Sequence, residues 1–409
     1  MPSAQSEILP ALAPITQIAR PLSTVEYYHS CVGRHPRTLE VQREIFFVFE
    51  GENDLPPERW QQALDLAAAA NPGTRLRLQG ERRRARWSSD GPPPRLRVVE
   101  ACHWDARSSQ GAEFLRATPL SLEDGPSVEL ILAPRAGLST LLVLRTPHAI
   151  MDGLGAMHFL QEMFRALRGE RLLGSNAGYS DVELMRSTGA RESTSKHFRT
   201  CWLTGAPQGT EQGDDWRRIA LGRPQKSQLG KLAAAFAEFA HRHSDLPALI
   251  AVPASLRRHA PGLLSTGNFS NMMLVPLAKG DGADAFRTRL EAMLAQRMDA
   301  VYPPILEAVR YLPLSWLDHL VSRTPRNYRK RRPMETVVIS NLGRIDSADY
   351  SAPGFRAASL CVLPLAGSAF AILTCMDGQT EITLNLPRVL SSGGRFDALE
   401  AHLRERFAD

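Results

Sequence analysis

Apolar and polar positions along the chain alternate in some segments and recur every three or four residues in others. The first pattern predicts strands and the second predicts helices. In the first half, strands are expected in VQREIFFVFEG, TRLRLQG, SVELILAP and STLLVLRTPH, and a helix in PPERWQQALDLAAAANP. In the second half, helices are expected in SQLGKLAAAFAEFAHRH, near 283–302 and at 395–407, and strands in ALIAVPASLR, NFSNMMLVPL, ETVVISNLG, SLCVLPLA, FAILTCM and EITLNL. Short connections between strands favour a mixed α/β fold with antiparallel or mixed sheets.

The chain is long enough for two domains. Its 409 residues exceed one ordinary core, and its 43% apolar and 22% charged content is typical of globular proteins. Between about 169 and 216 the composition shifts to Gly, Ser, Thr and Asp with little periodicity. We therefore expect one domain at 1–175, a connection at 176–215 and a second domain at 216–409.

No targeting or redox motif stands out. No apolar run reaches the roughly 18 to 20 residues of a membrane span, and the start of the chain lacks the pattern of a secretion signal. The five cysteines are far apart and form no CxxC pair. We expect a cytoplasmic monomer with reduced, mostly buried thiols and no membrane span.

The net charge of +6 and the pI near 9.2 favour anionic partners. Two basic clusters lie beside Pro, Gly or Ser, one in GERRRARW and one in SRTPRNYRKRRP. Each is either a solvated loop edge or a contact for phosphate or an acidic protein. Nucleic acid is not expected as a partner, because zinc-finger, RNP-like and basic-zipper patterns are missing from the sequence.

The stretch LLVLRTPHAIMDGLGAMHFLQEMF carries the candidate chemistry. His148, Asp152 and Gly153 fall on a turn between an apolar strand and a helix with one apolar face. A structural histidine at the strand end is one interpretation. A metal site with His158 lacks a third ligand at a recognised spacing, and a serine hydrolase lacks its Gly-x-Ser-x-Gly motif.

The remaining interpretation makes His148 a general base without a covalent intermediate. A neutral imidazole can take the proton of an incoming hydroxyl or amine and return it to a departing thiolate, which suits a thioester donor. Asp152, if buried, requires a cationic partner, and pairing with an Arg would lock the turn. Gly153 would leave room for substrate beside the backbone.

PHAIMDG resembles the HHxxxDG signature of the acyltransferase superfamily with the chloramphenicol-acetyltransferase fold, which includes condensation domains, wax ester synthases and polyketide-associated acyltransferases. RPLSTVEYYH, NPGTRLRL, PLSLEDGPSVELIL, VPASLRRHAPGLLSTGNFSNMM and ISNLGRID are similar to further landmarks of that superfamily, in the same order. The resemblance implies two such domains in a V shape with a central tunnel.

The resemblance also implies roles for single residues. His148 matches the catalytic base, Asp152 the structural aspartate, and Gly153 the glycine at the tunnel. Arg257 is the expected partner of Asp152, with Arg258 as the second choice. The remaining implied residues are Ser340 and Asn341 as oxyanion donors near the reaction centre and Asn271 as a substrate contact. Separately from the resemblance, the second basic cluster predicts contacts for the donor at Arg329, Lys330, Arg331 and Arg332. Ser340, Asn341, Asn268 and Asn271 can equally be simple turn residues.

The sequence departs from the signature at Pro147, which replaces the first histidine. The expected function is transfer of an acyl group from coenzyme A or an acyl carrier protein, as cosubstrate, to a hydroxyl or amine of a small natural-product or lipid acceptor. No permanently bound cofactor and no metal are expected. The alternatives are a free-standing condensation enzyme that forms an amide, and an inactive carrier-binding or scaffold protein, which Pro147 favours.

Overall fold

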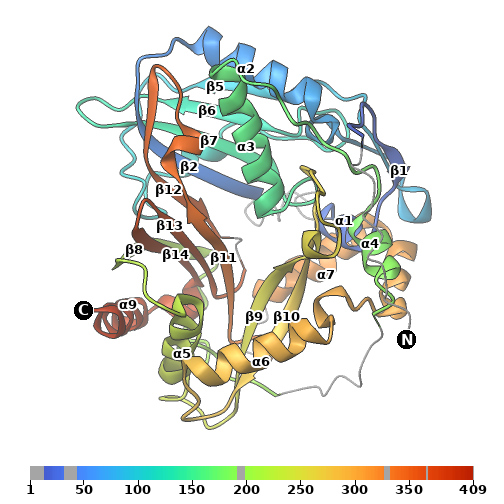
Figure 1. Ribbon diagram of the computed structural model, residues 1–409. Helices are drawn as coiled ribbons and strands as arrows, with labels where there is room; N and C mark the ends of the chain where they lie inside the picture. Colours follow the sequence, from blue (N-terminus) through green and yellow to red (C-terminus); the bar gives the residue numbers. More distant parts are fainter. Residues whose placement is uncertain (1–12, 32–43, 191–198, 327–331, 365–366, 409) are drawn as a thin grey trace, which may run out of the picture.

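The computed structural model describes residues 13–31, 44–190, 199–326, 332–364 and 367–408, which form two large sheets and one small sheet (Figure 1). The first large sheet has the strand order β12-β2-β7-β6-β5, the second β10-β9-β11-β13-β14-β8, and the small sheet β1-β4-β3. The strands are β1 (Ala19–Pro21), β2 (Glu44–Asn53), β3 (Arg77–Gln79), β4 (Arg86–Ser88), β5 (Arg95–Val98), β6 (Glu129–Ala133), β7 (Thr140–Pro147), β8 (Asp214–Gly222), β9 (Ala248–Ser255), β10 (Ser270–Leu277), β11 (Val337–Ile345), β12 (Phe355–Leu363), β13 (Phe370–Met376) and β14 (Gln379–Pro387).

The α-helices of the described residues lie mainly on the outer faces of these sheets (Figure 1). They are α1 (Thr24–His29), α2 (Pro57–Ala70), α3 (Gly153–Leu167), α4 (Asp181–Ser187), α5 (Gln228–Ala240), α6 (Ala283–Ala295), α7 (Leu314–Arg326), α8 (Arg388–Ser391) and α9 (Arg395–Phe407). The helix expected near 283–302 is shorter than predicted. It ends because Arg297 adopts a left-handed conformation with φ of 54°, and only a short 3-10 turn follows at Met298–Ala300.

The strand β7 is buried along nearly its whole length, which explains its unbroken apolar sequence. Leu142 and Leu144 face the core under α2 and α3, whereas Leu141 and Val143 face a second cluster on the other side of the sheet. A strand covered on both faces needs apolar residues at every position rather than at alternate ones. β7 pairs antiparallel with both β2 and β6, so the end of β7 is held in the middle of the sheet.

The second sheet contains both parallel and antiparallel pairs. β11 runs parallel to β9 and β13, while β9–β10, β13–β14 and β14–β8 are antiparallel. Ile339 and Leu373 pack with Phe236 of α5 and Phe396 of α9 in one core cluster. The mixed α/β class and the mixed sheets agree with the sequence prediction.

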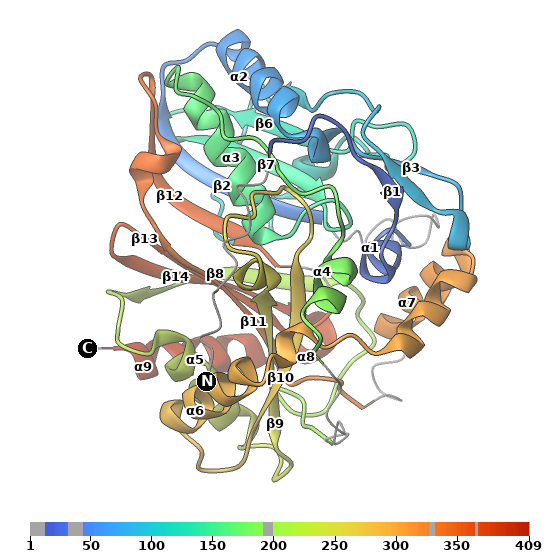
Figure 2. The same cartoon turned by 45° about the vertical axis from the view of Figure 1, so that its right-hand side comes forward.

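Elements from residues 216–409 also pack in the first half. β12 leaves the second half and pairs with β2 of the first, with Leu360 opposite Phe49 (Figure 2). Leu314 and Leu317 of α7 are buried in the first core, which also contains Tyr27 of α1. The expected connection at 176–215 contains the helix α4. A buried strand pattern specifies that a strand is covered, but not which sheet it joins.

The two halves form a V-shaped arrangement, with the first half above and the second below in Figure 1. The turn between β7 and α3 lies where the halves meet, and this position brings the HAIMDG segment close to β9, β10 and β11. Among the helices of the described residues, none is long and apolar enough to cross a bilayer. All five cysteines are buried.

Candidate active site at the junction of the two halves

His148 lines a cavity that both halves build. The first half contributes the turn after β7 and the start of α3, and the second half contributes the end of β9, the start of β10 and the middle of β11. The other lining residues are Ile45, Asp152, Gly153, Leu154, Pro253, Ser255, Ser270, Ser340, Asn341, Leu342, Val362, Leu363, Phe370 and Ile372. Apolar side chains therefore surround a small number of polar groups, as is usual in ligand pockets.

The ring of His148 is held by its Nδ1 atom. Nδ1 lies 3.0 Å from the carbonyl oxygen of Met151, and the Asn268 side-chain amide donates to the His148 carbonyl oxygen at 3.1 Å. The Asn268 amide nitrogen also lies 3.4 Å from Nδ1. Because a carbonyl oxygen can only accept, the shorter contact to Met151 favours the tautomer with the hydrogen on Nδ1. The neutral ring then has its lone pair on Nε2, which is the arrangement that a general base requires.

A second histidine lies against His148. The ring of His29, at the end of α1, stacks on the ring of His148 with centroids 4.4 Å apart and planes 23° apart. α1 is fixed at its start by a capping box between Ser23 and Glu26, and Arg20 pairs with Glu26 at 2.6 Å. The sequence analysis missed His29, because nothing in its spacing connects it with the HAIMDG segment.

Asp152 is the N-cap of α3, and its carboxylate is fully occupied by protein donors. Oδ1 accepts from the Gly155 N–H at 2.7 Å and Oδ2 from the Phe269 N–H at 2.8 Å. Arg257 adds a bidentate ion pair, with distances of 2.7 Å to Oδ2 and 3.0 Å to Oδ1. The partner that the resemblance suggested for Asp152 is therefore in contact with it.

Arg257 connects this ion pair to the backbone of the second half. Its Nη2 also donates to the carbonyl oxygens of Ser265 at 3.1 Å and Gly267 at 2.9 Å, and its guanidinium lies 5.4 Å from the Phe269 ring centroid. Arg258, the second choice, instead lies 3.4 Å from Asp299. The Asp152–Arg257 pair thus joins the turn that carries His148 to the loop before β10.

The two glycines at the start of α3 have different neighbours. A Cβ atom on Gly155 would lie 2.2 Å from the backbone oxygen of Thr266, so only glycine fits where the halves touch. A Cβ on Gly153 would lie 3.1 Å from Cδ2 of Leu342, a side chain that also lines the cavity. Sequence reasoning found Gly153 through the motif and missed Gly155.

Ser340 and Asn341 lie in the middle of β11, directly before an irregularity in its pairing with β13. Both line the His148 cavity. The Asn341 side-chain oxygen accepts from the Gly343 N–H at 2.9 Å, where Gly343 has φ of 77°. Asn341 therefore stabilises the local backbone and also lines the cavity, and its role as an oxyanion donor stays a prediction.

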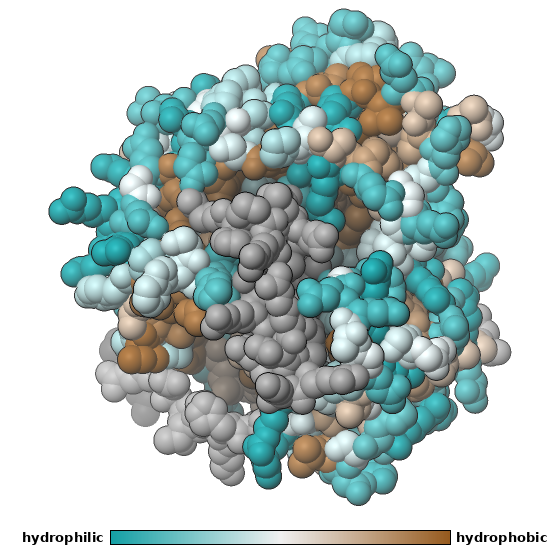
Figure 3. Space-filling view, turned by 180° about the vertical axis from the view of Figure 1, so that it is seen from behind, coloured by the Kyte–Doolittle hydropathy of each residue, from teal (hydrophilic) through white to brown (hydrophobic). Residues whose placement is uncertain are grey.

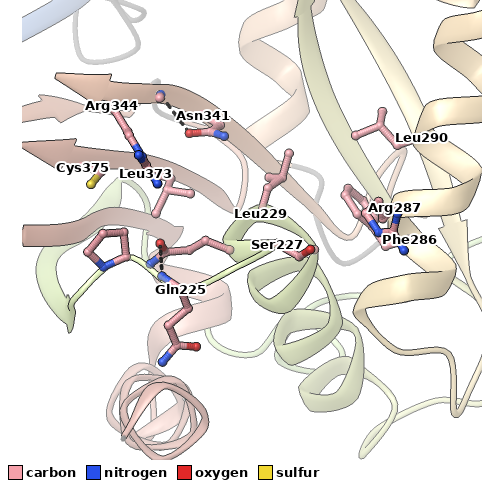
Figure 4. Close-up of a pocket in the computed structure, with 14 residues that line it drawn as sticks. Gln225, Ser227, Leu229, Phe286, Arg287, Leu290, Asn341, Arg344, Leu373 and Cys375 are labelled. Carbon is pink, nitrogen blue, oxygen red and sulfur yellow. Dashed lines mark hydrogen bonds between the residues drawn. The ribbon is translucent and has the colours of Figure 1, made fainter. Parts of the chain in front are cut away.

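Asn341 also lines a second cavity on the side of α5 and α6 (Figure 4). Arg344, Leu373 and Cys375 from the sheet face Leu229 and Phe286 from these helices across it, with Arg287 nearby. Ile372 of the His148 cavity belongs to the first core, whereas the neighbouring Leu373 belongs to the core under α5 and α9. Since successive residues of a strand point to opposite faces, the two cavities lie on opposite faces of the second sheet.

The remaining predicted residues are not brought to His148. The Asn271 amide donates to the carbonyl oxygens of Asp299 at 2.8 Å and Val301 at 3.1 Å, and its oxygen accepts from the Met272 N–H, so we do not retain Asn271 as a substrate contact. Arg332 lines a separate cavity with Trp202. The predicted donor contacts Arg329, Lys330 and Arg331 lie outside the described residues.

His158 has a structural place. Its Nε2 lies 3.1 Å from the carbonyl oxygen of Gly174, and burial lowers the pKa of this imidazole below its ordinary value. Within the described ranges, no three His, Cys, Asp or Glu side chains are grouped so that they could hold a metal ion.

No protein-family model and no curated protein matches this sequence. Solved structures do match, over nearly the whole chain. The starter condensation domain of rhizomide synthetase, a double mutant in complex with C8-CoA and Leu-SNAC, has a TM-score of 0.64 at 16% identity and covers 96% of this chain and 95% of its own. The first condensation domain of the calcium-dependent antibiotic synthetase, with a substrate analogue, has a TM-score of 0.63 at 15% identity, covering 97% and 98%.

The epimerization domain from the third module of tyrocidine synthetase B is also similar, with a TM-score of 0.60 at 13% identity and 96% of each chain covered. At such identities the likeness concerns the fold, and function must be argued from the site. The chain therefore has the fold of these nonribosomal condensation and epimerization domains.

Proposed function

We propose that the chain is an acyltransferase of the condensation type. It moves an acyl group from a phosphopantetheine thioester, on coenzyme A or an acyl carrier protein, to a hydroxyl or amine of a small natural-product or lipid acceptor. The observation that carries the proposal is the state of His148. Its Nδ1–H is held by the Met151 carbonyl oxygen, and the ring lines a cavity built by both halves.

The step needs one base and no covalent intermediate. The lone pair on Nε2 of His148 takes the proton of the acceptor hydroxyl or amine while the acceptor oxygen or nitrogen bonds to the thioester carbonyl carbon. The C–S bond then breaks, the sulfur leaves with the electron pair, and the proton on Nε2 passes to this thiolate. An ester or amide and a free thiol result, and the imidazole is neutral again.

The lining of the cavity supports this chemistry. Val362, Phe370 and Ile372 offer an apolar surface to an acyl chain, and Ser340 offers a hydroxyl from the middle of β11. We assign the stabilisation of the developing oxyanion to Ser340, because a fixed donor helps most where charge appears. The C8-CoA in the complex with the starter condensation domain supports a coenzyme A thioester as a donor to test first.

Two alternatives share this geometry. An amide-forming condensation enzyme would use the same base, so the acceptor distinguishes it. A non-catalytic carrier-binding protein is the reading that Pro147 favours, because the first histidine of the signature is missing. The stack of His29 on His148 argues for a maintained site, since a second imidazole lies beside the base in this chain.

The test is a turnover assay with the purified full chain. A panel of acyl-coenzyme A thioesters of increasing chain length is mixed with hydroxyl and amine acceptors, and thiol release is followed together with product masses. We expect acceptor-dependent thiol release that His148→Ala abolishes. Thiol release that is independent of acceptor and of His148, or no turnover with any pair while a carrier protein binds, would favour the non-catalytic alternative.

A further inference from the structure

Two consecutive helical segments display apolar side chains to solvent. They are the 3-10 helix η7 (Pro304–Tyr311) and α7, which follows it. We call their large exposed apolar side chains the η7–α7 face: Ile305, Leu306, Tyr311, Trp316 and Leu320. Ile305 is 77% and Trp316 66% exposed. Single exposed apolar residues are common on proteins, but a group on neighbouring turns marks an interaction surface.

The backbone under this face is well anchored. Tyr27 of α1 donates its hydroxyl to the Leu312 carbonyl oxygen at 2.8 Å, and the Leu314 N–H donates to Glu81 at 3.1 Å. Leu314 and Leu317 are buried in the core of the first half. Trp316 and Leu320, four residues apart and thus on one side of α7, point away from that core. α7 therefore carries apolar residues on both sides, unlike an ordinary surface helix.

A basic rim borders the η7–α7 face. The short 3-10 helix η3 (Arg82–Arg84) packs next to η7, and the Arg83 guanidinium lies 5.0 Å from the Tyr311 ring centroid. Arg82, Arg83 and Arg84 are all exposed, and none forms an ion pair with a carboxylate of the described residues. This rim is the first basic cluster of the sequence, for which the proposed acyl transfer provides no role.

Acidic side chains close to the face have protein partners or are buried, although Glu81, which accepts from the Leu314 N–H, is exposed beside the three arginines. Glu307 pairs with Arg186 at 2.8 Å and with Arg310 at 3.5 Å, and Asp318 is fully buried. Figure 3 views the molecule from behind, so the side with α7 is at the left of the picture. Apolar residues in brown border hydrophilic residues in teal there. The accessible surface is thus apolar in the centre and positively charged at the rim.

We propose that the η7–α7 face binds an anionic membrane surface, with its apolar side chains in the boundary between headgroups and acyl chains. Arg82, Arg83 and Arg84 would then meet the lipid phosphates. Apolar and aromatic residues on one side of a helix beside basic residues are the pattern of segments that lie in the membrane interface. Trp and Tyr are favoured at this depth, and each basic residue adds attraction to anionic lipids.

A lipid surface suits this face better than a protein partner does. Ile305 and Trp316 protrude strongly from two adjacent short helices. A protein would have to offer matching pockets to cover them, whereas a fluid lipid boundary accepts protruding side chains of any shape. An acidic carrier protein remains the competing occupant because it would meet the same arginines, so the experiment includes it. The inference stands whether or not His148 is a base.

The experiment measures binding of the purified full chain to phosphatidylcholine vesicles with and without phosphatidylserine, by flotation. We expect binding to the phosphatidylserine vesicles, and weaker binding at high salt because the arginines are screened. The double variant Trp316→Ser/Leu320→Ser and the triple variant Arg82→Glu/Arg83→Glu/Arg84→Glu should each bind at least about tenfold more weakly. The matched control is Leu138→Ser, which removes a side chain that is equally exposed, at 66%, in the β6–β7 connection.

Melting temperatures of all variants should stay close to that of the wild type, since the changed side chains are exposed. The proposal is overturned by equal binding to neutral and phosphatidylserine vesicles, by binding that the double variant retains, or by no vesicle binding at all. It is also overturned if an acyl carrier protein binds at these residues while the vesicles do not.

Discussion

His148 and Asp152 lie four residues apart on one turn, yet their surroundings differ in kind. The Asp152 carboxylate accepts two backbone N–H bonds and a bidentate pair from Arg257, all from protein. The His148 ring lies 3.0 Å from the Met151 carbonyl oxygen through Nδ1 and borders the cavity. A carboxylate whose acceptor sites are filled by protein donors has no capacity left for substrate. We therefore propose a structural role for Asp152 and a chemical role for His148.

The largest expected effect tests the chemical side. His148→Ala should lower turnover by about a hundredfold or more, the usual contribution of a general base. The melting temperature should change little, because the ring is only half-buried. Thiol release and thermal unfolding measure the two properties. The control is His158→Gln, which changes a histidine held by Gly174 away from the cavity lining and should keep turnover. Equal turnover of wild type and His148→Ala would contradict the mechanism.

Substitution of Asp152 should mainly lower stability, in contrast to substitution of His148. Asp152→Asn leaves the Arg257 cation without its buried counter-charge, so the free energy of unfolding should fall by about 3 kcal/mol. Urea unfolding measures it. The control is Glu52→Gln, which breaks an ion pair of 2.6 Å with Arg356 between β2 and β12. That pair is exposed, and its loss should cost less than about 1 kcal/mol. A stable Asp152→Asn protein with lost turnover would move Asp152 to the chemical side.

Gly155 and Gly153 test the same difference between a structural and a chemical position, with substitutions that do not change charge. Gly155→Ala forces a methyl group against the Thr266 carbonyl oxygen, which is backbone and cannot move freely, so unfolding should require about 2 kcal/mol less. Gly153→Ala meets only the Leu342 side chain, so stability should hold while the KM for the acyl donor changes. Urea unfolding and steady-state kinetics on both variants test this. Two variants with equal stability would show that the contact between α3 and the second half is not tight.

Much of the fold could be predicted from apolar periodicity. The continuous run of β7 reflects burial on both faces, and the ends of α2 follow from proline and Asn-Pro. The pairing of β12 with β2 could not be predicted, because side-chain pattern says nothing about which distant edge a strand joins. The helix at residues 314–326 was also not predicted. Leu314 and Leu317 are buried in the first core, whereas Trp316 and Leu320 are exposed, so its apolar residues do not form a single face.

The site divides in a similar way. The motif residues and Arg257 could be found from the sequence because they belong to landmarks with a fixed order. Asn271 was predicted as a substrate contact, but its side-chain amide donates to the carbonyl oxygens of Asp299 and Val301. His29 could not be found, because the contact between its ring and His148 exists only once α1 is packed against the turn.

The smallest expected effect concerns the stack of His29 on His148. It decides whether His29 has a structural role, by positioning the base, or a chemical one. If its ring positions the base by stacking, His29→Phe should keep most of the turnover, because an aromatic ring can still lie against His148. His29→Leu should lower turnover by about tenfold, since misplacing a base weakens the alignment that catalysis needs. Tyr28→Leu, on the same turn of α1, controls for damage to the helix itself. Equal loss in His29→Phe and His29→Leu would mean that the imidazole nitrogens matter, and His29 would then join His148 as a chemical group. Full turnover in both variants would show that the stack with His29 is not needed to position the base.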